Sequence, residues 1–155
     1  MRYNKIILLM LLAVSLWGEK VQITSDRMKA IDKKKEIHFI GNAKVTQLQD
    51  WIHGNEIIIY FDENNETKKY VAKGKVTFEL HQKEALYKGK ADKVTYFPKK
   101  SEYILTGKAV IDDLVNKRHV NGDEIVLNTV TGDANVKGNS KKPVKFIFDM
   151  EKKGE

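Results

Sequence analysis

The 155-residue chain contains no cysteine and only two prolines, Pro98 and Pro143. Without a thiol it can form neither a disulfide nor a thiolate metal site, and it has no cysteine nucleophile. The folded state must therefore be stabilised by packing rather than by covalent cross-links.

Signatures of catalysis are missing as well. His38, His53, His81 and His119 are scattered along the chain without the spacing of a zinc site, and each is better read as a strand or turn residue. The chain has no Gly-x-Ser-x-Gly elbow and no phosphate-cradling loop. We therefore expect no enzyme activity, no metal site and no cofactor.

The composition is that of a folded protein with a basic surface. Apolar residues make up 41% of the chain and charged residues 32%, which argues against wholesale disorder. The net charge of +7 is spread along the chain, which is typical of a solvated surface and also favours a phosphate-bearing partner. We expect no nucleic acid as that partner, because the sequence has no zinc spacing, aromatic RNA-binding signature or recognition helix. An anionic lipid stays as a candidate.

The amino terminus carries the pattern of a secretory signal. Arg2 and Lys5 precede an unbroken apolar run over residues 6–16, and polar sequence resumes at Gly18. The run is much shorter than the roughly 20 residues that a membrane-spanning helix needs. We predict a cleavable signal peptide over residues 1–18 and export of the protein, with retention of this segment as an anchor as the alternative.

The remaining chain alternates apolar and polar residues with the period of a β-strand. The alternation covers residues 37–45, 70–80 and 103–111. The glycines within these stretches, Gly41, Gly74 and Gly107, recur every 33 residues, and a shorter final copy contains Gly132, Ala134 and Val136. This regularity indicates an internal repeat, in which each glycine marks a bend or bulge.

A second β-forming element precedes each glycine strand. Its copies cover residues 25–30, 54–60, 90–96 and 122–127, and each carries an acidic residue. Turn formers at 32–35, 62–69 and 98–101 separate the two elements, so each repeat is predicted to be a pair of strands. The fold class is therefore all-β, built from stacked repeats that cannot bury their apolar face singly. We expect one domain over residues 19–150 and a disordered tail over 151–155.

The alternation also predicts which side chains point inward. The residues expected to form one apolar lining are Met28, Ala30, Ile37, Phe39, Val45, Ile58, Tyr60, Tyr70, Val76, Phe78, Val94, Tyr96, Tyr103, Leu105, Ala109, Ile111 and Val126. The run 57–60 is apolar on both faces, so its assignment stays open.

Four segments resemble the OstA-like family of lipopolysaccharide-transport proteins: residues 40–47, 89–96, 105–110 and 121–125. The resemblance extends from about residue 21 to 138. It implies a β-jellyroll, a folded-over antiparallel sheet with a V-shaped cross-section and an apolar interior. The lining residues would then hold the acyl chains of lipopolysaccharide.

The resemblance further implies a location and partners. Family members act in the periplasm and associate head to tail, as a bridge that carries lipopolysaccharide from an LptC-like inner-membrane protein to an LptD-like outer-membrane protein. This chain departs from the family where residues 48–51 replace a family glycine after Gln47. The first turn is therefore expected to differ.

Two alternatives and one structural question stay open. The chain could be an LptC-like carrier that is anchored in the inner membrane, or a structural β-repeat protein that binds no lipid. Residues 144–148 are predicted to form a last strand, whose edge either adds a strand from another chain or is paired within its own sheet.

Overall fold

The computed structural model describes residues 20–150 and consists of one antiparallel sheet. The signal peptide predicted over residues 1–18 and the tail predicted over 151–155 lie outside the described residues. The ten strands are β1 (Gln22–Thr24), β2 (Arg27–Ile31), β3 (Glu36–Gln47), β4 (Asp50–Phe61), β5 (Thr67–Gln82), β6 (Ala85–Phe97), β7 (Glu102–Asp113), β8 (Arg118–Asn128), β9 (Ala134–Lys137) and β10 (Lys145–Phe148). Two single-turn 3₁₀ helices, η1 (Asp32–Lys34) and η2 (Pro98–Lys100), connect strands.

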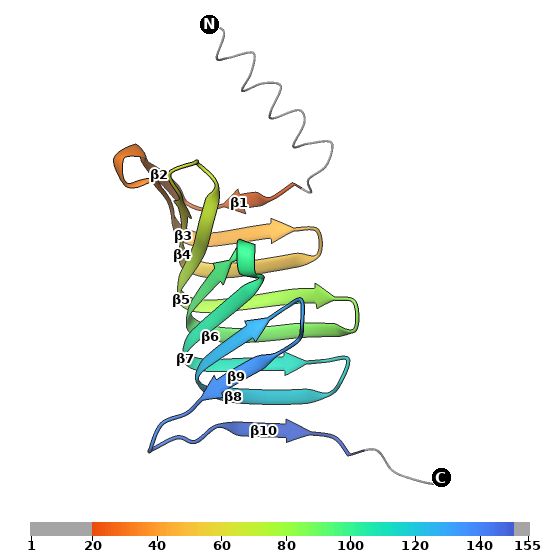
Figure 1. Ribbon diagram of the computed structural model, residues 1–155. Helices are drawn as coiled ribbons and strands as arrows, with labels where there is room; N and C mark the ends of the chain where they lie inside the picture. Colours follow the sequence, from red (N-terminus) through yellow and green to blue (C-terminus); the bar gives the residue numbers. More distant parts are fainter. Residues whose placement is uncertain (1–19, 151–155) are drawn as a thin grey trace, which may run out of the picture.

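The strands follow one another in the sheet almost in sequence order. The order is β1-β3-β4-β5-β6-β7-β8-β10, with β2 also paired to β3 and β9 also paired to β8. Each long strand turns back on its predecessor through a short connection, so Figure 1 shows hairpins stacked from β1 at one end to β10 at the other. This arrangement confirms the all-β prediction of stacked strand pairs.

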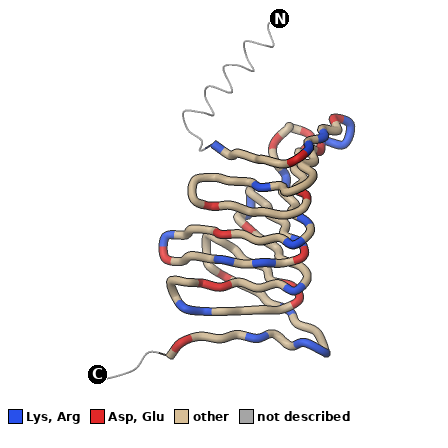
Figure 2. The backbone as a smooth tube through the Cα atoms, turned by 180° about the vertical axis from the view of Figure 1, so that it is seen from behind, with Lys and Arg blue, Asp and Glu red and all other residues tan. Residues whose placement is uncertain are grey.

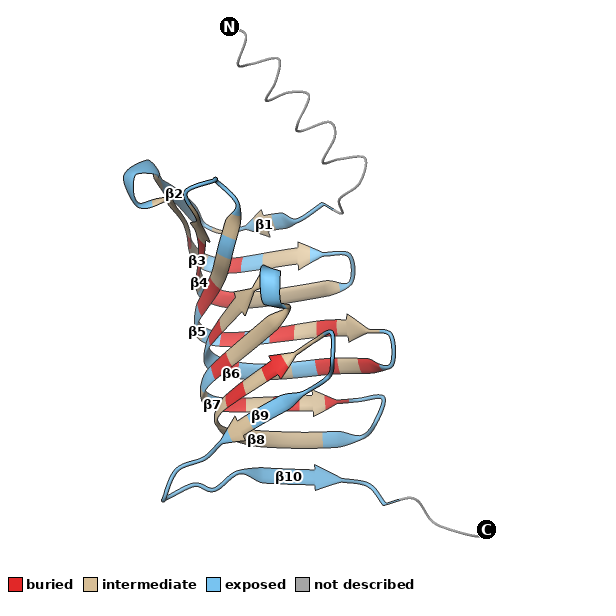
Figure 3. Cartoon of the chain, in the orientation of Figure 1, coloured by how far each residue is buried: buried red, intermediate tan, exposed pale blue. Residues whose placement is uncertain are grey.

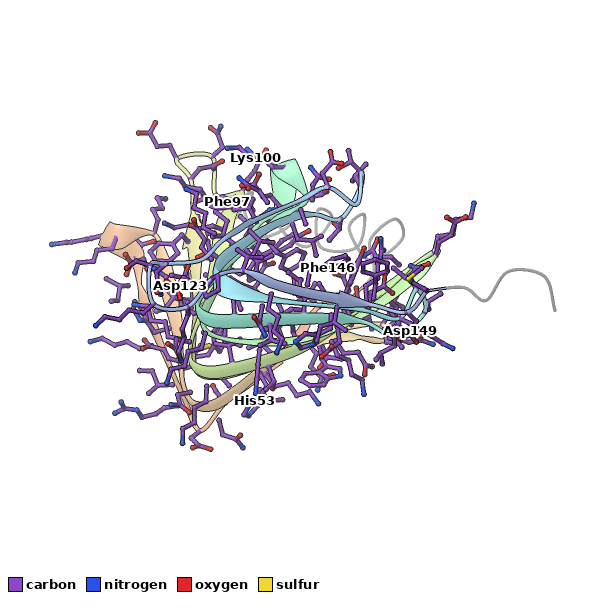
Figure 4. The ribbon with its side chains drawn as sticks, turned by 90° about the horizontal axis from the view of Figure 1, so that it is seen from below. His53, Phe97, Lys100, Asp123, Phe146 and Asp149 are labelled. Atoms are coloured by element: carbon purple, nitrogen blue, oxygen red, sulfur yellow. The ribbon has the colours of Figure 1, made fainter. Side chains whose placement is uncertain are left out.

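Each long strand bends near its middle, and the bends align into one corner. The register shifts between neighbouring strands fall beside the glycines of the repeat, for example between Ile40 and Ala43 of β3 and between Lys73 and Val76 of β5. Such bulges bend a strand and increase its twist. The sheet therefore folds over into two walls, and the view along the stack shows a V (Figure 4).

We call the two halves of the folded sheet wall 1 and wall 2. Wall 1 contains β2, residues 36–40, 56–61, 67–73, 93–97, 102–106 and 124–128, and β9. Wall 2 contains β1, residues 43–47, 50–54, 76–82, 85–91, 109–113 and 118–122, and β10.

The terminal strands are split at the same corner. β1 and β2 pair with the two halves of β3, and they are separated only by Ser25 and Asp26. β9 and β10 pair with the two halves of β8, separated by residues 138–144. The predicted last strand is therefore paired within its own sheet along β8, and its other edge pairs with no strand among residues 20–150.

The corner has a repeated chemistry. Gly74 and its counterparts Gly41 and Gly107 adopt φ between +80° and +84°, a region in which glycine has no steric penalty. A carboxylate or amide side chain lies against each of them, namely that of Asp26, Asn55 or Asp92. An acidic or amide residue of the second element thus packs over each of these three glycines.

The prediction that Gly132 is the corner glycine of the final copy is wrong. Gly132 lies in the turn between β8 and β9, and no atom lies within 4 Å of the position of a Cβ there. Gly138 lies at the corner instead, next to Asn139, whose amide donates a hydrogen bond to Asp123. The repeat pattern in this copy is interrupted by the longer connection to β10.

The core lies between the two walls. Figure 3 shows buried residues in a band across the stacked strands, whereas β10 is exposed along its whole length. The largest fully buried side chains are Ile57, Val76, Leu80, Val94, Leu105 and Ile125. They come from five different strands, so the core forms only when the whole sheet folds over.

One buried carboxylate stabilises the end of wall 2. Asp113 is 4% exposed and accepts hydrogen bonds from the Arg118 guanidinium (2.7 Å), the Asn116 amide (2.7 Å) and the Val115 backbone N–H (3.2 Å). Burial by itself raises the pKa of Asp113, but the hydrogen bonds from Arg118 and Asn116 outweigh it and hold the pKa below its usual value.

We predict that Asp113→Asn lowers the free energy of unfolding by about 2 kcal/mol at neutral pH, because the ion pair with Arg118 is lost. A carboxylate whose pKa is lowered by folding stabilises the protein above its unfolded pKa of about 4, and this contribution is lost as pH falls through the folded pKa. Urea unfolding at several pH values measures it. The difference between wild type and variant is expected to be constant above about pH 5 and to shrink below about pH 4; a difference that is the same at pH 3 and pH 7 contradicts the assignment.

Candidate functional site

A cavity of about 350 Å³ lies between the walls in the amino-terminal half of the sheet. Wall 1 contributes Ile57, Thr67, Tyr70, Ala72, Val94, Tyr96 and Tyr103, with Pro98 of η2 beside them. Wall 2 contributes Val45, Gln47, Asp50, Ile52 and Leu80, and Val21 precedes β1. Trp51 also borders the cavity, but its ring lies on the outer face beside Lys44. Most of these side chains are aliphatic or aromatic, so the cavity suits the apolar part of a ligand.

Three tyrosines line wall 1 near its free edge. Tyr70, Tyr96 and Tyr103 are cross-strand neighbours on β5, β6 and β7. Their rings stack, with centroids 6.0 Å apart for Tyr70 and Tyr96 and 4.3 Å apart for Tyr96 and Tyr103. Burial raises the pKa of Tyr96 and that of Tyr103, so both hydroxyls are neutral at physiological pH. The three rings form an uncharged aromatic ladder at the mouth of the cavity.

The opposite edge of the mouth, on wall 2, is more polar. Gln47 and Asp50 are paired across the hairpin of β3 and β4, and both line the cavity. The backbone N–H of His81 donates a hydrogen bond to Asp50 Oδ1 (2.7 Å), which fixes this carboxylate beside β5. The mouth therefore has an aromatic side and a side with a carboxylate.

Most residues predicted to point inward do so. Val45, Tyr70, Val94, Tyr96 and Tyr103 line the cavity itself. Seven others are part of the packed core or pack against it, and they are Ile37, Phe39, Val76, Phe78, Leu105, Ala109 and Ile111. Met28 and Ala30 pair with Phe39 and Ile37 and thus share the inward face, but both are exposed because β2 is at the end of the stack.

Three of the predicted lining residues are wrong. Ile58 and Tyr60 pair with His38 and Glu36, so they lie on the outer face of wall 1. Val126 pairs with Ile104 and Asn135 on the same outer face. Their immediate neighbours in sequence point inward instead, because the corner of β4 and of β8 contains a residue that does not pair and reverses the alternation.

Many other residues also point inward that the alternation did not predict. They are Ile23, Ala43, Ile52, Ile57, Ile59, Phe61, Ala72, Leu80, Ala85, Tyr87, Ala91, Val120, Ile125, Leu127 and Val136. Some of them could have been predicted from a second regularity in the sequence. The residue two positions after Asn55, Asp92 or Asp123 is apolar in each copy and points inward. Asp50 and Gln47 carried no such signal.

The histidines lie on the outer faces of the walls, and His81 contacts Asp50 at the edge of the cavity. His38 lies between Glu56 and Glu36, whose hydrogen bonds raise its pKa. His53 points away from the interior of the V (Figure 4). Within residues 20–150 no group of three His, Asp or Glu side chains is placed to hold a metal ion. Nor does any helix in that range have the length and apolarity to cross a membrane.

Charge does not gather at any one site. Figure 2 shows lysine and arginine spread over turns, corner and strands, interspersed with acidic residues. The features that stand out are thus the two-walled sheet and the apolar cavity between its walls. Together they define a β-jellyroll protein whose interior suits an apolar ligand.

The comparisons with known proteins identify the family. Residues 22–133 match the family described as LptA/(LptD N-terminal domain) LPS transport protein, and the chain belongs to this family. The match confirms the resemblance drawn from the four sequence segments, and the family is one of transport components rather than enzymes. A search of curated proteins found no match.

A solved structure has the same fold. It is the crystal structure of LptH, described as the LptA homologous periplasmic component of the conserved lipopolysaccharide transport device from Pseudomonas aeruginosa. The two chains are 18% identical, the TM-score is 0.73, and the match covers 85% of this chain and 96% of the other. The predicted β-jellyroll is thereby confirmed.

Proposed function

We propose that the protein binds lipopolysaccharide through the cavity between its walls and carries it across the periplasm, from the inner to the outer membrane. The observation that carries this proposal is the apolar cavity in a member of a lipopolysaccharide-transport family. The periplasmic location agrees with the secretory pattern of residues 1–18.

The chemistry of the interior supports acyl chains as the bound part. An acyl chain gains about 0.8 kcal/mol for each methylene group removed from water. Aliphatic and aromatic walls therefore hold such a chain without a catalytic or charged group. The core beyond the cavity is closely packed, with Val76 and Leu105 at 0% exposure, so we expect the chains to enter from the mouth.

The two ends of the sheet support a head-to-tail bridge of several copies. At the amino-terminal end, Met28 shares the inward face and is 63% exposed. At the carboxy-terminal end, Phe146 pairs with the inward Val120, stacks on Phe148 and lies between the walls in Figure 4. Apolar inward side chains are thus uncovered at both ends, which suits continuation of the path into another copy or into LptC-like and LptD-like partners.

The nearest alternative is an inner-membrane carrier anchored by an uncleaved amino terminus. The short apolar run over residues 6–16 favours cleavage. Sequencing the amino terminus of the exported protein separates the two, since the bridge protein is expected to begin near residue 19 and the anchored carrier at residue 1.

Site-specific photo-crosslinking in cells tests the proposed lipid path. A photoreactive amino acid at Tyr96, which lines the cavity, is expected to capture lipopolysaccharide. The matched control is Thr95, the adjacent residue on the same strand, which pairs with Val71 and Ile104 on the outer face and is expected to capture none. Equal labelling at both positions contradicts the proposed path, and labelling at neither contradicts the function.

A further inference from the structure

Among residues 20–150, Asp50 is the only charged side chain that lines the cavity. It begins β4, on the wall 2 edge of the mouth, next to Leu80 of the core. A carboxylate at the opening of an apolar cavity repels a phosphate, and an acyl chain cannot solvate it. A cationic group of a ligand at the mouth would be attracted to it.

The hydrogen bonds of Asp50 leave one oxygen for a ligand. Oδ1 accepts the bond from the His81 backbone N–H (2.7 Å), and His81 Nδ1 lies 3.4 Å from the same oxygen. No hydrogen bond within residues 20–150 involves Oδ2. The side chain is thus held in place through one oxygen while the other is available at the mouth.

The aromatic ladder faces this carboxylate across the mouth. Burial is the main cause that raises the pKa of Tyr96 and of Tyr103, and the negative charge of Asp50 adds to it for both residues. The carboxylate therefore acts electrostatically on the two rings from the opposite wall. A protonated amine between them would gain a charge-assisted hydrogen bond to Asp50 and could donate a second hydrogen bond to a tyrosine hydroxyl oxygen.

We propose that Asp50 and the ladder of Tyr96 and Tyr103 form a subsite for a protonated amine on the head group of the cargo. The protein would then prefer a phosphoglycolipid that carries a primary amine, such as a phosphoethanolamine substituent, over the same lipid without it. This inference rests on the proposed function, and it adds the class of lipid that the mouth of the cavity selects.

Equilibrium binding of two lipids to the purified exported protein tests the subsite. The probes are lipid A carrying phosphoethanolamine and the bis-phosphorylated lipid A that lacks it. Wild type is expected to bind the amine-bearing lipid about three- to tenfold more tightly. Asp50→Asn keeps an oxygen for the His81 N–H and is expected to abolish that preference while binding of the amine-free lipid stays the same or tightens.

Glu79→Gln is the matched control. Glu79 lies on the outer face of the same wall, 3.5 Å from the ring of the same His81, and does not line the cavity. The control is expected to retain the full preference for the amine-bearing lipid. Equal affinity of wild type for the two lipids overturns the subsite, and so does an equal loss for both lipids in Asp50→Asn. Failure of the proposed function has a different result, because wild type then binds neither lipid.

Discussion

Replacement of Leu105 by alanine is expected to lower the free energy of unfolding by about 3–4 kcal/mol. Leu105 is completely buried in wall 1, between its cross-strand neighbours Val94 and Ile125, which are also buried. Truncation removes apolar area from the centre of the core and leaves a cavity that the surrounding strands cannot close, since their corners and registers are fixed. Urea-induced unfolding of the purified protein measures the loss.

Ile104→Ala is the control for this prediction. Ile104 is adjacent in β7 but belongs to the outer face, where it pairs with Thr95 and Val126 and is only partly buried. We expect the free energy of unfolding to fall by only about 1 kcal/mol for this variant. Ile104 buries less apolar surface on folding than Leu105, and solvent can fill the space that the truncation leaves. If both variants lose the same amount, the assignment of the inner and outer faces of β7 is wrong.

The second large effect is expected at the corner, for Gly74→Ala. A Cβ on Gly74 would lie 2.5 Å from Asn55 Nδ2 and 2.9 Å from Asn55 Cβ, and the backbone there has φ of +80°. The new methyl group therefore adds a steric overlap to the strain of a left-handed conformation. We expect the free energy of unfolding to fall by about 2–4 kcal/mol, as measured by urea unfolding.

Gly132→Ala separates these two contributions. Gly132 has nearly the same φ, +78°, but no atom lies within 4 Å of the position of its Cβ. Only the conformational strain applies, so we expect a loss of about 1 kcal/mol. If Gly74→Ala loses no more stability than Gly132→Ala, the predicted steric overlap with Asn55 is contradicted.

The faces of the glycine strands could be predicted, and those of the other strands only in part. In β3, β5 and β7 the corner contains two consecutive residues with positive φ, such as Gly74 and Lys75, and the alternation continues unchanged from one wall to the other. In β4, β6 and β8 a single unpaired residue at the corner, such as Asn55, shifts the alternation by one. In these strands, the residues that point inward on one wall therefore cannot be predicted by continuing the alternation from the other wall.

The errors at Ile58, Tyr60 and Val126 have this origin. Each lies in a run of consecutive apolar residues, 57–60 or 125–127, in which hydrophobicity does not distinguish the faces. Val94 and Tyr96 were assigned correctly because Lys93 and Thr95 alternate with them. Counting two residues on from Asp26, Asn55, Asp92 or Asp123 would have given the right face in every copy.

The sequence by itself determined the all-β class, the repeat and the family, because these depend on local alternation, on regular glycine spacing and on motifs that are contiguous in the chain. Only the tertiary structure decided where the cavity lies and which side chains form its mouth. Tyr70, Tyr96 and Tyr103 meet through the register of three strands, and Asp50 faces them only because the sheet folds over at its corner. Contacts between residues so distant in sequence depend on register and on the direction of the fold, and neither is encoded in the local pattern.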